Sequence, residues 1–231
     1  MGIKGKIRLL FVILCCDVCL IGIYGSALVD RFWGEQNMVS VSGQAAGEKI
    51  VALTFDDGPH ARYTQTLLEG LRERQVKVSF FLVGENIEGN EALVKQMAAD
   101  GHFIGVHGYR HVDLTKQSIE TSCDEIRKTA DQIEGITGSR PEYIRPPYGS
   151  WNRTLEECVE MLPVFWDIDT RDWESQNSGT IVTHIRQNVG KHHIILLHDV
   201  FESSVAAALR AVDMLTEEGY TFVTVEELLI D

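Results

Sequence analysis

Apolar and polar positions alternate along residues 49–231 in a rhythm that predicts parallel strands joined by helices. Short β-rich runs such as Ile50-Val51-Ala52-Leu53 are followed by stretches whose apolar residues recur every three to four positions. The predicted strands are 50–55, 78–83, 102–106, one leading into Ile144, 164–169, 193–198 and 220–223, and the predicted helices lie near 63–74, 90–100, 116–135, 152–161, 179–189, 203–218 and 224–229. About seven βα units favour a (β/α) barrel over an open sheet, with closure of the barrel left open.

The first 33 residues form an apolar leader. A basic flank that includes Lys4 precedes a run from Leu9 to Val29, interrupted only by Asp17. As a helix this run would span about 30 Å of hydrocarbon. We expect an uncleaved N-terminal membrane helix, because the run is longer than the apolar core of a usual signal peptide. A cleaved signal peptide is the alternative, since Gly25-Ser26-Ala27 is an acceptable small-residue cleavage site.

The leader divides the chain into three parts. Residues 34–48 are rich in Gly, Ser, Gln and Ala and predict a flexible linker, which leaves 49–231 as one globular domain. The positive flank stays in the cytoplasm, so we expect a single-pass protein of the cell membrane with its domain outside the cytoplasm. If the leader is cleaved, the domain is secreted.

The net charge limits the kinds of binding partner, and the cysteine content limits the possible disulfides. The formal net charge is -13, from 21 basic and 34 acidic side chains, and such a surface repels phosphate backbones and argues against nucleic acid as a partner. Three cysteines lie in the leader, which leaves Cys123 and Cys158 in the domain. We expect these two to be free, buried thiols; a disulfide between them is the alternative.

Two adjacent carboxylates stand at the end of the first predicted strand, in Thr54-Phe55-Asp56-Asp57-Gly58-Pro59. The carboxyl ends of parallel strands are the edge where ligands and catalytic groups collect. Successive strand residues point to opposite faces, so one carboxylate could bind a metal while the other handles a proton. An ordinary turn in which Asp57 caps the next helix is the alternative.

Four further predicted strand ends carry polar side chains. They are His107-Gly108-Tyr109-Arg110-His111, Arg145-Pro146-Pro147-Tyr148-Gly149, the segment from Trp166 to Trp173 with three aspartates, and His198-Asp199. Each taken alone has an ordinary explanation, either a chance pair of histidines, a structural turn or a structural histidine. Together they make five strand ends of one α/β repeat that carry reactive groups, which favours an active site.

Three of these side chains suit a metal. Asp57, His107 and His111 would supply one oxygen and two nitrogens to a divalent ion and leave open positions for water and substrate, as in catalytic zinc sites. Zinc can lower the pKa of bound water from about 15.7 to about 7. Such a site predicts hydrolysis of a carbonyl compound.

As an ordered set, these segments resemble the five motifs of the polysaccharide deacetylases, carbohydrate esterase family 4. The motifs are Thr54 to Pro59, His107 to His111, Arg145 to Tyr148, Asp169-Thr170-Arg171-Asp172-Trp173 and Leu196-Leu197-His198. The resemblance covers about residues 49–230. It implies a distorted (β/α) barrel that removes acetyl groups from sugars with a divalent metal, usually Zn²⁺, with Co²⁺ or another transition ion as the alternative.

The resemblance also implies a role for each site residue. Asp56 would be the general base, held by Arg145, and Asp57, His107 and His111 would be the metal ligands. An attacked amide becomes a tetrahedral oxyanion, which a metal and a fixed N–H stabilise; the resemblance assigns that N–H to the backbone of Tyr148.

The remaining implied roles concern the leaving group and the acetyl group. His198 would be the general acid, tuned by Asp169, because an amine leaves poorly unless it is protonated. Trp173 and Leu196 would form the wall around the acetyl methyl group. Gly108 departs from the family pattern, which usually has Ser or Thr there, and the missing hydroxyl predicts a less well braced metal loop.

The expected function is removal of N-acetyl groups from N-acetylglucosamine-containing polysaccharide, peptidoglycan or chitin-like, by hydrolysis of a linear amide other than a peptide bond. One alternative is an O-deacetylase of acetylated xylan or another polysaccharide ester. A carbohydrate-binding or sporulation-type protein with an inactive site is a third class. The pattern leaves the oligomeric state open.

Overall fold

The structure, a computed structural model, describes residues 48–157 and 159–230 of the 231-residue chain. The predicted membrane helix or signal peptide (1–33) and residues 34–47 of the predicted linker therefore lie outside the described residues. Among the residues that are described, no helix is both long and apolar enough to cross a membrane.

The described residues contain an eight-stranded sheet in which every strand pair is parallel. The strands are β1 (Ile50–Asp56), β2 (Ser79–Leu82), β3 (Phe103–Val106), β4 (Tyr143–Ile144), β5 (Leu162–Pro163), β6 (Ile168–Asp169), β7 (His192–His198) and β8 (Thr221–Phe222). Seven of them follow the order β5-β4-β3-β2-β1-β7-β6, and β8 pairs with the start of β1. β5 and β6 are the two ends of this order, so the sheet is a curled half-barrel, a more open form of the predicted barrel.

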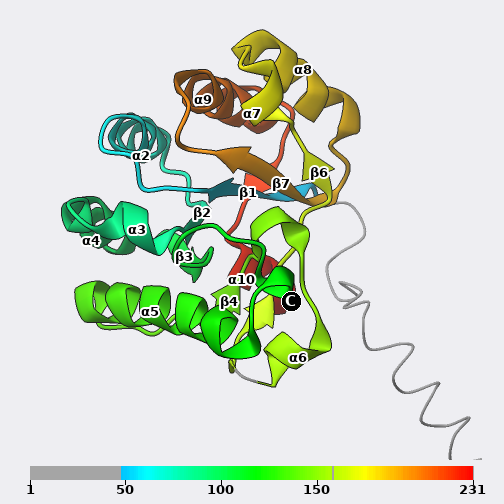
Figure 1. The fold of residues 1–231 in the computed structure, drawn as a ribbon. Helices are drawn as coiled ribbons and strands as arrows, with labels where there is room; N and C mark the ends of the chain where they lie inside the picture. The colour runs from blue at the N-terminus through cyan, green and yellow to red at the C-terminus, as the bar shows by residue number, and fades with distance from the viewer. Residues whose placement is uncertain (1–47, 158, 231) are drawn as a thin grey trace, which may run out of the picture. The chain divides into compact units, whose positions relative to one another are not determined.

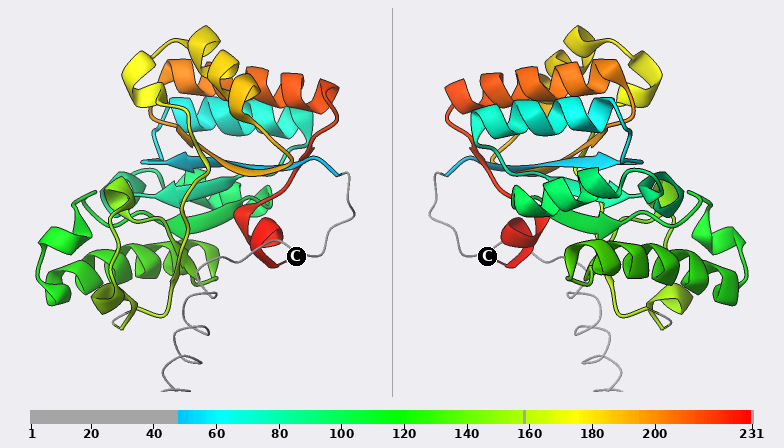
Figure 2. Two further views of the ribbon diagram at one scale, coloured as in Figure 1. Left: turned by 90° about the vertical axis from the view of Figure 1, so that its right-hand side faces the viewer. Right: turned by 90° about the vertical axis from the view of Figure 1, so that its left-hand side faces the viewer.

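Helices cover the outside of the curled sheet. They are α2 (Tyr63–Arg74), α3 (Gly84–Ile87), α4 (Glu91–Ala99), α5 (Ile119–Thr137), α6 (Arg153–Glu156), α7 (Asp172–Ser175), α8 (Ser178–Asn188), α9 (Glu202–Glu217) and α10 (Val225–Ile230), with 3₁₀ turns at Leu114–Lys116 and Pro147–Gly149. Neighbouring helices contact one another in the order α8, α9, α2, α4, α5, and Figure 1 shows them following one another around the sheet. In the views of Figure 2, α9 and α2 lie on one side of the strands and α5 on the other.

The two faces of β1 have different tasks, and the alternation of its residues explains why. Val51, Leu53 and Phe55 belong to the main hydrophobic core, whereas Ile50 and Ala52 belong to a second, smaller core. Successive strand residues point to opposite faces, so Thr54 and Asp56 share the face of Ile50 and Ala52. Thr54 and Asp56 are almost fully buried. The first predicted catalytic carboxylate thus points into the concave face of the half-barrel.

The predicted strand 164–169 is wrong as a single element. β5 pairs with β4 and β6 pairs with β7, and the chain crosses from one edge of the sheet to the other between Val164, whose N–H still donates to Ile144, and Asp167, whose N–H donates to Ile194. In this gap the backbone carbonyls of Val164 and Phe165 accept hydrogen bonds from the Arg145 guanidinium, at 3.3 and 3.1 Å. Their partner is therefore a side chain, which a periodic apolar pattern does not indicate.

Two smaller expectations also differ from the structure. The predicted helix near 152–161 is reduced to the four residues of α6, with Asn152 capping it. Cys123 is disulfide-bonded, which contradicts the expected free thiol, and its partner lies outside the described residues.

Candidate active site

The predicted site residues meet at the carboxyl edge of the sheet. Asp56 and His198 end two neighbouring strands and are direct partners in the register of β1 and β7. A cleft of about 410 Å³ opens above them. It is lined by Asp56, Asp57, His107, His111, Pro146, Tyr148, Trp166, Asp169, Trp173, Leu196, His198 and Phe201. Nine of the ten predicted site residues line this cleft, and the tenth, Arg145, is buried behind Asp56.

Asp57, His107 and His111 form a compact cluster of potential ligands. Nε2 of His107 lies 3.5 Å from Oδ1 of Asp57, and Nε2 of His111 lies 3.4 Å from the same oxygen. One ligand atom from each residue lies within 4.8 Å of the other two. Burial and the neighbouring His107 lower the pKa of His111, which favours the neutral, ligating form of its imidazole.

The hydrogen bonds around this cluster fit a bound cation. Oδ1 of Asp57 is buried and has no hydrogen-bond partner, although such atoms are usually paired. Nδ1 of His107 donates to the backbone carbonyl of Arg145 at 2.6 Å. That bond fixes the tautomer and leaves the Nε2 lone pair directed at the cluster. Two imidazoles and a carboxylate suit zinc and related transition ions.

Asp56 is held by a buried arginine. Nη1 of Arg145 donates to Oδ1 of Asp56 at 2.9 Å and to the hydroxyl of Thr54 at 2.6 Å, and Arg145 is fully buried. Burial lowers the pKa of Arg145, and the neighbouring Asp56 opposes that shift. The hydroxyl of Thr54 donates in turn to the carbonyl of Ile195 at 2.8 Å. This contact between Arg145 and Asp56 is the one that the family resemblance implied.

The carboxylate that contacts His198 is Asp172, and the predicted Asp169 makes a different contact. Oδ1 of Asp172 accepts from Nδ1 of His198 at 2.8 Å, and Oδ2 accepts from the His198 backbone N–H at 2.8 Å. Asp169 accepts from the backbone N–H of Arg171 at 2.9 Å and lies at the cleft wall. Arg171 has a left-handed backbone (φ 53°), which turns the chain and brings Asp172 back toward β7. The family resemblance implied that Asp169 tunes His198, but the carboxylate that the structure places against the His198 ring is that of Asp172.

This contact and the nearby carboxylates set the ionisation of His198. Burial lowers the pKa of the imidazole, but the hydrogen bond and charge of Asp172, with the charges of Asp56 and Asp57, together outweigh burial and raise the pKa to about 9. His198 is therefore an imidazolium at neutral pH and can donate a proton into the cleft.

Strained backbone also gathers at this edge. Asp57 (φ 72°), His111 (φ 53°) and Tyr148 (φ 60°) are non-glycine residues in the left-handed region. Such conformations cost of order 1–3 kcal/mol each and cluster at functional sites. The ring of Tyr148 lies edge-on to that of His111, with centroids 4.7 Å apart, and the Tyr148 side chain is exposed.

The walls of the cleft are apolar and aromatic. Leu196 is buried beneath it, and Trp173, half exposed, stands at its rim. Sequence reasoning missed Trp166 and Phe201, which complete the wall. Trp166 was visible at the head of the aspartate-rich segment, whereas Phe201 follows β7 by three residues and carried no signal.

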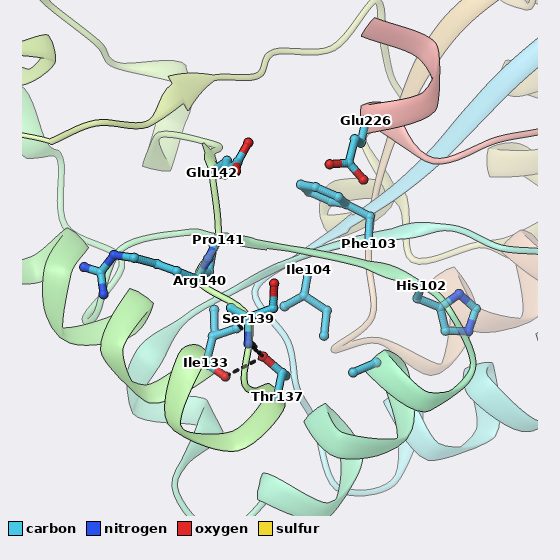
Figure 3. Close-up of a pocket in the computed structure, with 11 residues that line it drawn as sticks. His102, Phe103, Ile104, Ile133, Thr137, Ser139, Arg140, Pro141, Glu142 and Glu226 are labelled. Carbon is cyan, nitrogen blue, oxygen red and sulfur yellow. Dashed lines mark hydrogen bonds between the residues drawn. The ribbon is translucent and has the colours of Figure 1, made fainter. Parts of the chain in front are cut away.

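A second cavity, of about 250 Å³, lies at the amino ends of β3 and β4, on the opposite edge of the sheet. Figure 3 shows the last turn of α5 on one side of it and His102 on the other. No predicted site residue lines this cavity. The predicted chemistry therefore belongs to the cleft at the carboxyl edge.

A parallel α/β half-barrel with a two-histidine, one-carboxylate cluster beside a protonated histidine and a held carboxylate has the features of a hydrolase. A family profile described as polysaccharide deacetylase matches residues 43–164. The chain therefore belongs to the polysaccharide deacetylase family, a family of hydrolases that act on amide bonds, and the resemblance in the motifs is confirmed.

Two of the similar proteins are named as peptidoglycan deacetylases. The chain is 36% identical over 181 residues to the peptidoglycan-N-acetylmuramic acid deacetylase PdaC of Bacillus subtilis, covering 78% of this chain and 39% of that protein. It is 35% identical over 203 residues to the peptidoglycan-N-acetylglucosamine deacetylase PgdA of Listeria monocytogenes, covering 88% of this chain and 44% of that protein. The chain thus spans about two fifths of the length of these relatives. The solved structure of PdaC superposes with a TM-score of 0.77 at 35% identity and covers 80% of this chain and 92% of that one.

Proposed function

We propose that this chain is a metal-dependent hydrolase that removes N-acetyl groups from N-acetylglucosamine-containing polysaccharide of the peptidoglycan or chitin type. The observation that carries the proposal is the meeting of three sets of groups at one cleft. These are the ligand cluster of Asp57 with its two histidines, the carboxylate of Asp56 held by Arg145, and His198 held by Asp172.

The ligand cluster would hold a divalent ion, for which we propose zinc. Asp57, His107 and His111 would bind it, and the ion would supply Lewis acidity to the attacking water and to the carbonyl oxygen. Measurement of the metal content of the purified chain tests the choice of ion, and a stoichiometric ion other than zinc would refute it.

Asp56 would take a proton from the attacking water. Its carboxylate lies at the cleft, and Arg145 holds one oxygen while the second, Oδ2, lies 3.6 Å from Nε2 of His107 beside the ligand cluster. A fixed carboxylate loses little orientational freedom when it accepts the proton, which favours general base catalysis.

His198 would donate a proton to the leaving nitrogen. A carbon–oxygen bond forms to the water oxygen, the carbon–nitrogen bond breaks, acetate leaves, and the sugar keeps the amine with the donated proton. Asp172 holds Nδ1 of the ring, so Nε2 is the atom left to donate. The backbone N–H of Tyr148, at the rim of the cleft, would donate to the oxyanion, and Trp173 with Leu196 would enclose the acetyl methyl.

The test is an assay of the purified full-length chain with N-acetylglucosamine oligomers, N-acetylmuramic acid glycan and acetylated xylan, each with zinc. We expect acetate and free amine in equal amounts from the N-acetylglucosamine oligomers. Asp56→Asn should bind zinc and lose turnover, by about 10²-fold to 10⁴-fold as for loss of a general base, whereas Asp57→Ala should lose zinc binding as well. Absence of amine product, or product that survives Asp56→Asn, would contradict the proposal, and acetate from xylan alone would favour an ester hydrolase.

We also propose an extracytoplasmic location, at the cell membrane through the leader or secreted after its cleavage. The support is the apolar run from Leu9 to Val29 behind a basic flank. External protease added to intact cells should degrade a membrane-bound chain. Full protection that ends only on lysis would refute this location.

A further inference from the structure

The metal loop from Gly108 to His111 has a brace that does not depend on a hydroxyl at position 108. Gly108 (φ 75°) and His111 (φ 53°) both have left-handed backbone, so the loop needs partners to hold this shape. A side chain at Gly108 would meet only Pro147, at an ordinary 3.5 Å. Because Gly108 has no side chain that could hold the loop, the hydrogen bonds that fix its conformation have to come from other parts of the chain.

Glu125, on α5, binds the loop through both carboxylate oxygens. Oε2 accepts from the backbone N–H groups of Tyr109 at 3.2 Å and Arg110 at 2.8 Å. Oε1 accepts from Nε of Arg110 at 2.7 Å and pairs with its Nη2 at 2.6 Å. Glu125 is 5% exposed, and a buried carboxylate is stable only when its oxygens are satisfied in this way.

Thr129 lies one helical turn later, on the same face of α5. Its hydroxyl donates to the carbonyl of Gly108 at 2.9 Å, and Thr129 is fully buried. From the other side, the backbone N–H groups of Gly84 and Glu85 donate to the carbonyls of Gly108 and Tyr109, at 3.0 and 2.9 Å. The loop is thus held between α3 and α5.

We propose that Glu125 and Thr129 are positioning residues of the metal site. They hold the loop in the conformation that places His111 beside Asp57, although neither touches the cluster itself. The inference rests on the proposed function, because it assigns to α5 the support of the proposed metal ligands. Loss of groups that orient metal ligands typically weakens metal binding about 10-fold to 100-fold.

The test measures zinc affinity of the full chain by competition with a coloured zinc chelator. Glu125→Gln places an amide N–H₂ among four N–H donors, so we expect its dissociation constant for zinc to rise about 10-fold to 100-fold. Thr129→Val, which keeps the shape and removes the hydroxyl, should raise it about threefold to tenfold, as for one net hydrogen bond. Glu120→Gln is the matched control, since it makes the same change of charge at an exposed position of α5 and should bind zinc as the natural chain does.

If Glu125 only positions the metal loop, its substitution should weaken zinc binding without lowering the kcat of the zinc-loaded chain. In excess zinc, Glu125→Gln should recover a kcat close to that of the natural chain, whereas a catalytic residue would not recover. Zinc affinity of Glu125→Gln equal to that of Glu120→Gln would overturn the proposal.

One further variant, used together with Thr129→Val, keeps the inference testable if Glu125→Gln does not fold. Arg110→Gln removes only the side-chain half of the Glu125 contact, at a residue whose side chain is 51% exposed. If Glu125→Gln does not fold, natural zinc affinity in both Arg110→Gln and Thr129→Val would overturn the inference. The outcomes also separate the two proposals. If the natural chain is inactive but Glu125→Gln binds zinc more weakly, only the proposed function is refuted. If the natural chain is active but Glu125→Gln binds zinc as tightly as the natural chain does, only the positioning role is refuted.

Discussion

Each edge of the sheet holds a largely enclosed histidine, His198 partly buried and His102 buried, and the pKa values of the two imidazoles are shifted in opposite directions. At the carboxyl edge burial lowers the pKa of His198, but the hydrogen bond and charge of Asp172 and the charges of Asp56 and Asp57 together outweigh burial and raise the pKa to about 9. At the amino edge burial lowers the pKa of His102 to about 4. Nδ1 of His102 accepts a hydrogen bond from the backbone N–H of Val78 at 3.1 Å. Nearby carboxylates therefore keep His198 protonated despite its burial, whereas at His102 burial dominates and keeps the imidazole neutral.

The surroundings of the two rings match this difference. His198 lines the cleft with the ligand cluster, whereas His102 packs edge-on against Phe80 with centroids 5.4 Å apart. We infer a catalytic role for the first and a structural role for the second. The same substitution at both positions can separate these roles.

The largest expected effect is on turnover. His198→Asn should lower kcat by about 10²-fold to 10⁴-fold, because asparagine keeps a polar atom near the Nδ1 position and removes the Nε2 proton donor. His102→Asn should leave kcat within about twofold. The measurement is steady-state deacetylation with saturating metal, and equal losses of kcat in the two variants would contradict a catalytic role for His198 alone.

A smaller effect is expected on the pH profile. Asp172→Asn removes the strongest of the contacts that raise the pKa of His198, so the imidazolium should lose its proton at lower pH and the alkaline limb of kcat should move to lower pH by about one unit or more. Asp169→Asn retains an acceptor for the Arg171 N–H and should leave that limb in place. A shift in Asp169→Asn with none in Asp172→Asn would restore the partner that the sequence predicted.

A third effect, on stability and not on turnover, is expected at the amino edge. The folded-state pKa of His102 is lowered from 6.5 to about 4, so between these values the unfolded chain binds a proton that the folded chain does not. The natural chain should therefore lose roughly 3 kcal/mol more than His102→Asn as pH falls from 6.5 to 4, with no further difference below that range. Urea unfolding of both chains across this interval measures the difference, and parallel curves would show that His102 is protonated in the folded state.

The order of elements was predictable because β1, β2, β3 and β7 are short apolar runs separated by amphipathic helices. The meeting of Asp56, His107, Arg145 and His198 was predictable for the same reason, since parallel strands bring their carboxyl ends to one edge. The interruption between β5 and β6 was not predictable from the sequence. There the carbonyl of Phe165 accepts a hydrogen bond from the side chain of Arg145, which lies 20 positions earlier in the chain.

The sequence by itself determined which chemical groups this protein has at the carboxyl edge, because strand periodicity and strand ends are local properties of the chain. Only the tertiary structure decided how those groups pair. The left-handed turn at Arg171 selects Asp172 over Asp169 as the partner of His198, and α5 brings Glu125 to a loop 15 positions away. Such pairings depend on the exact positions of neighbouring carboxylates. Those positions are set by packing between helices and strands that are distant in sequence, and local sequence patterns do not show that packing.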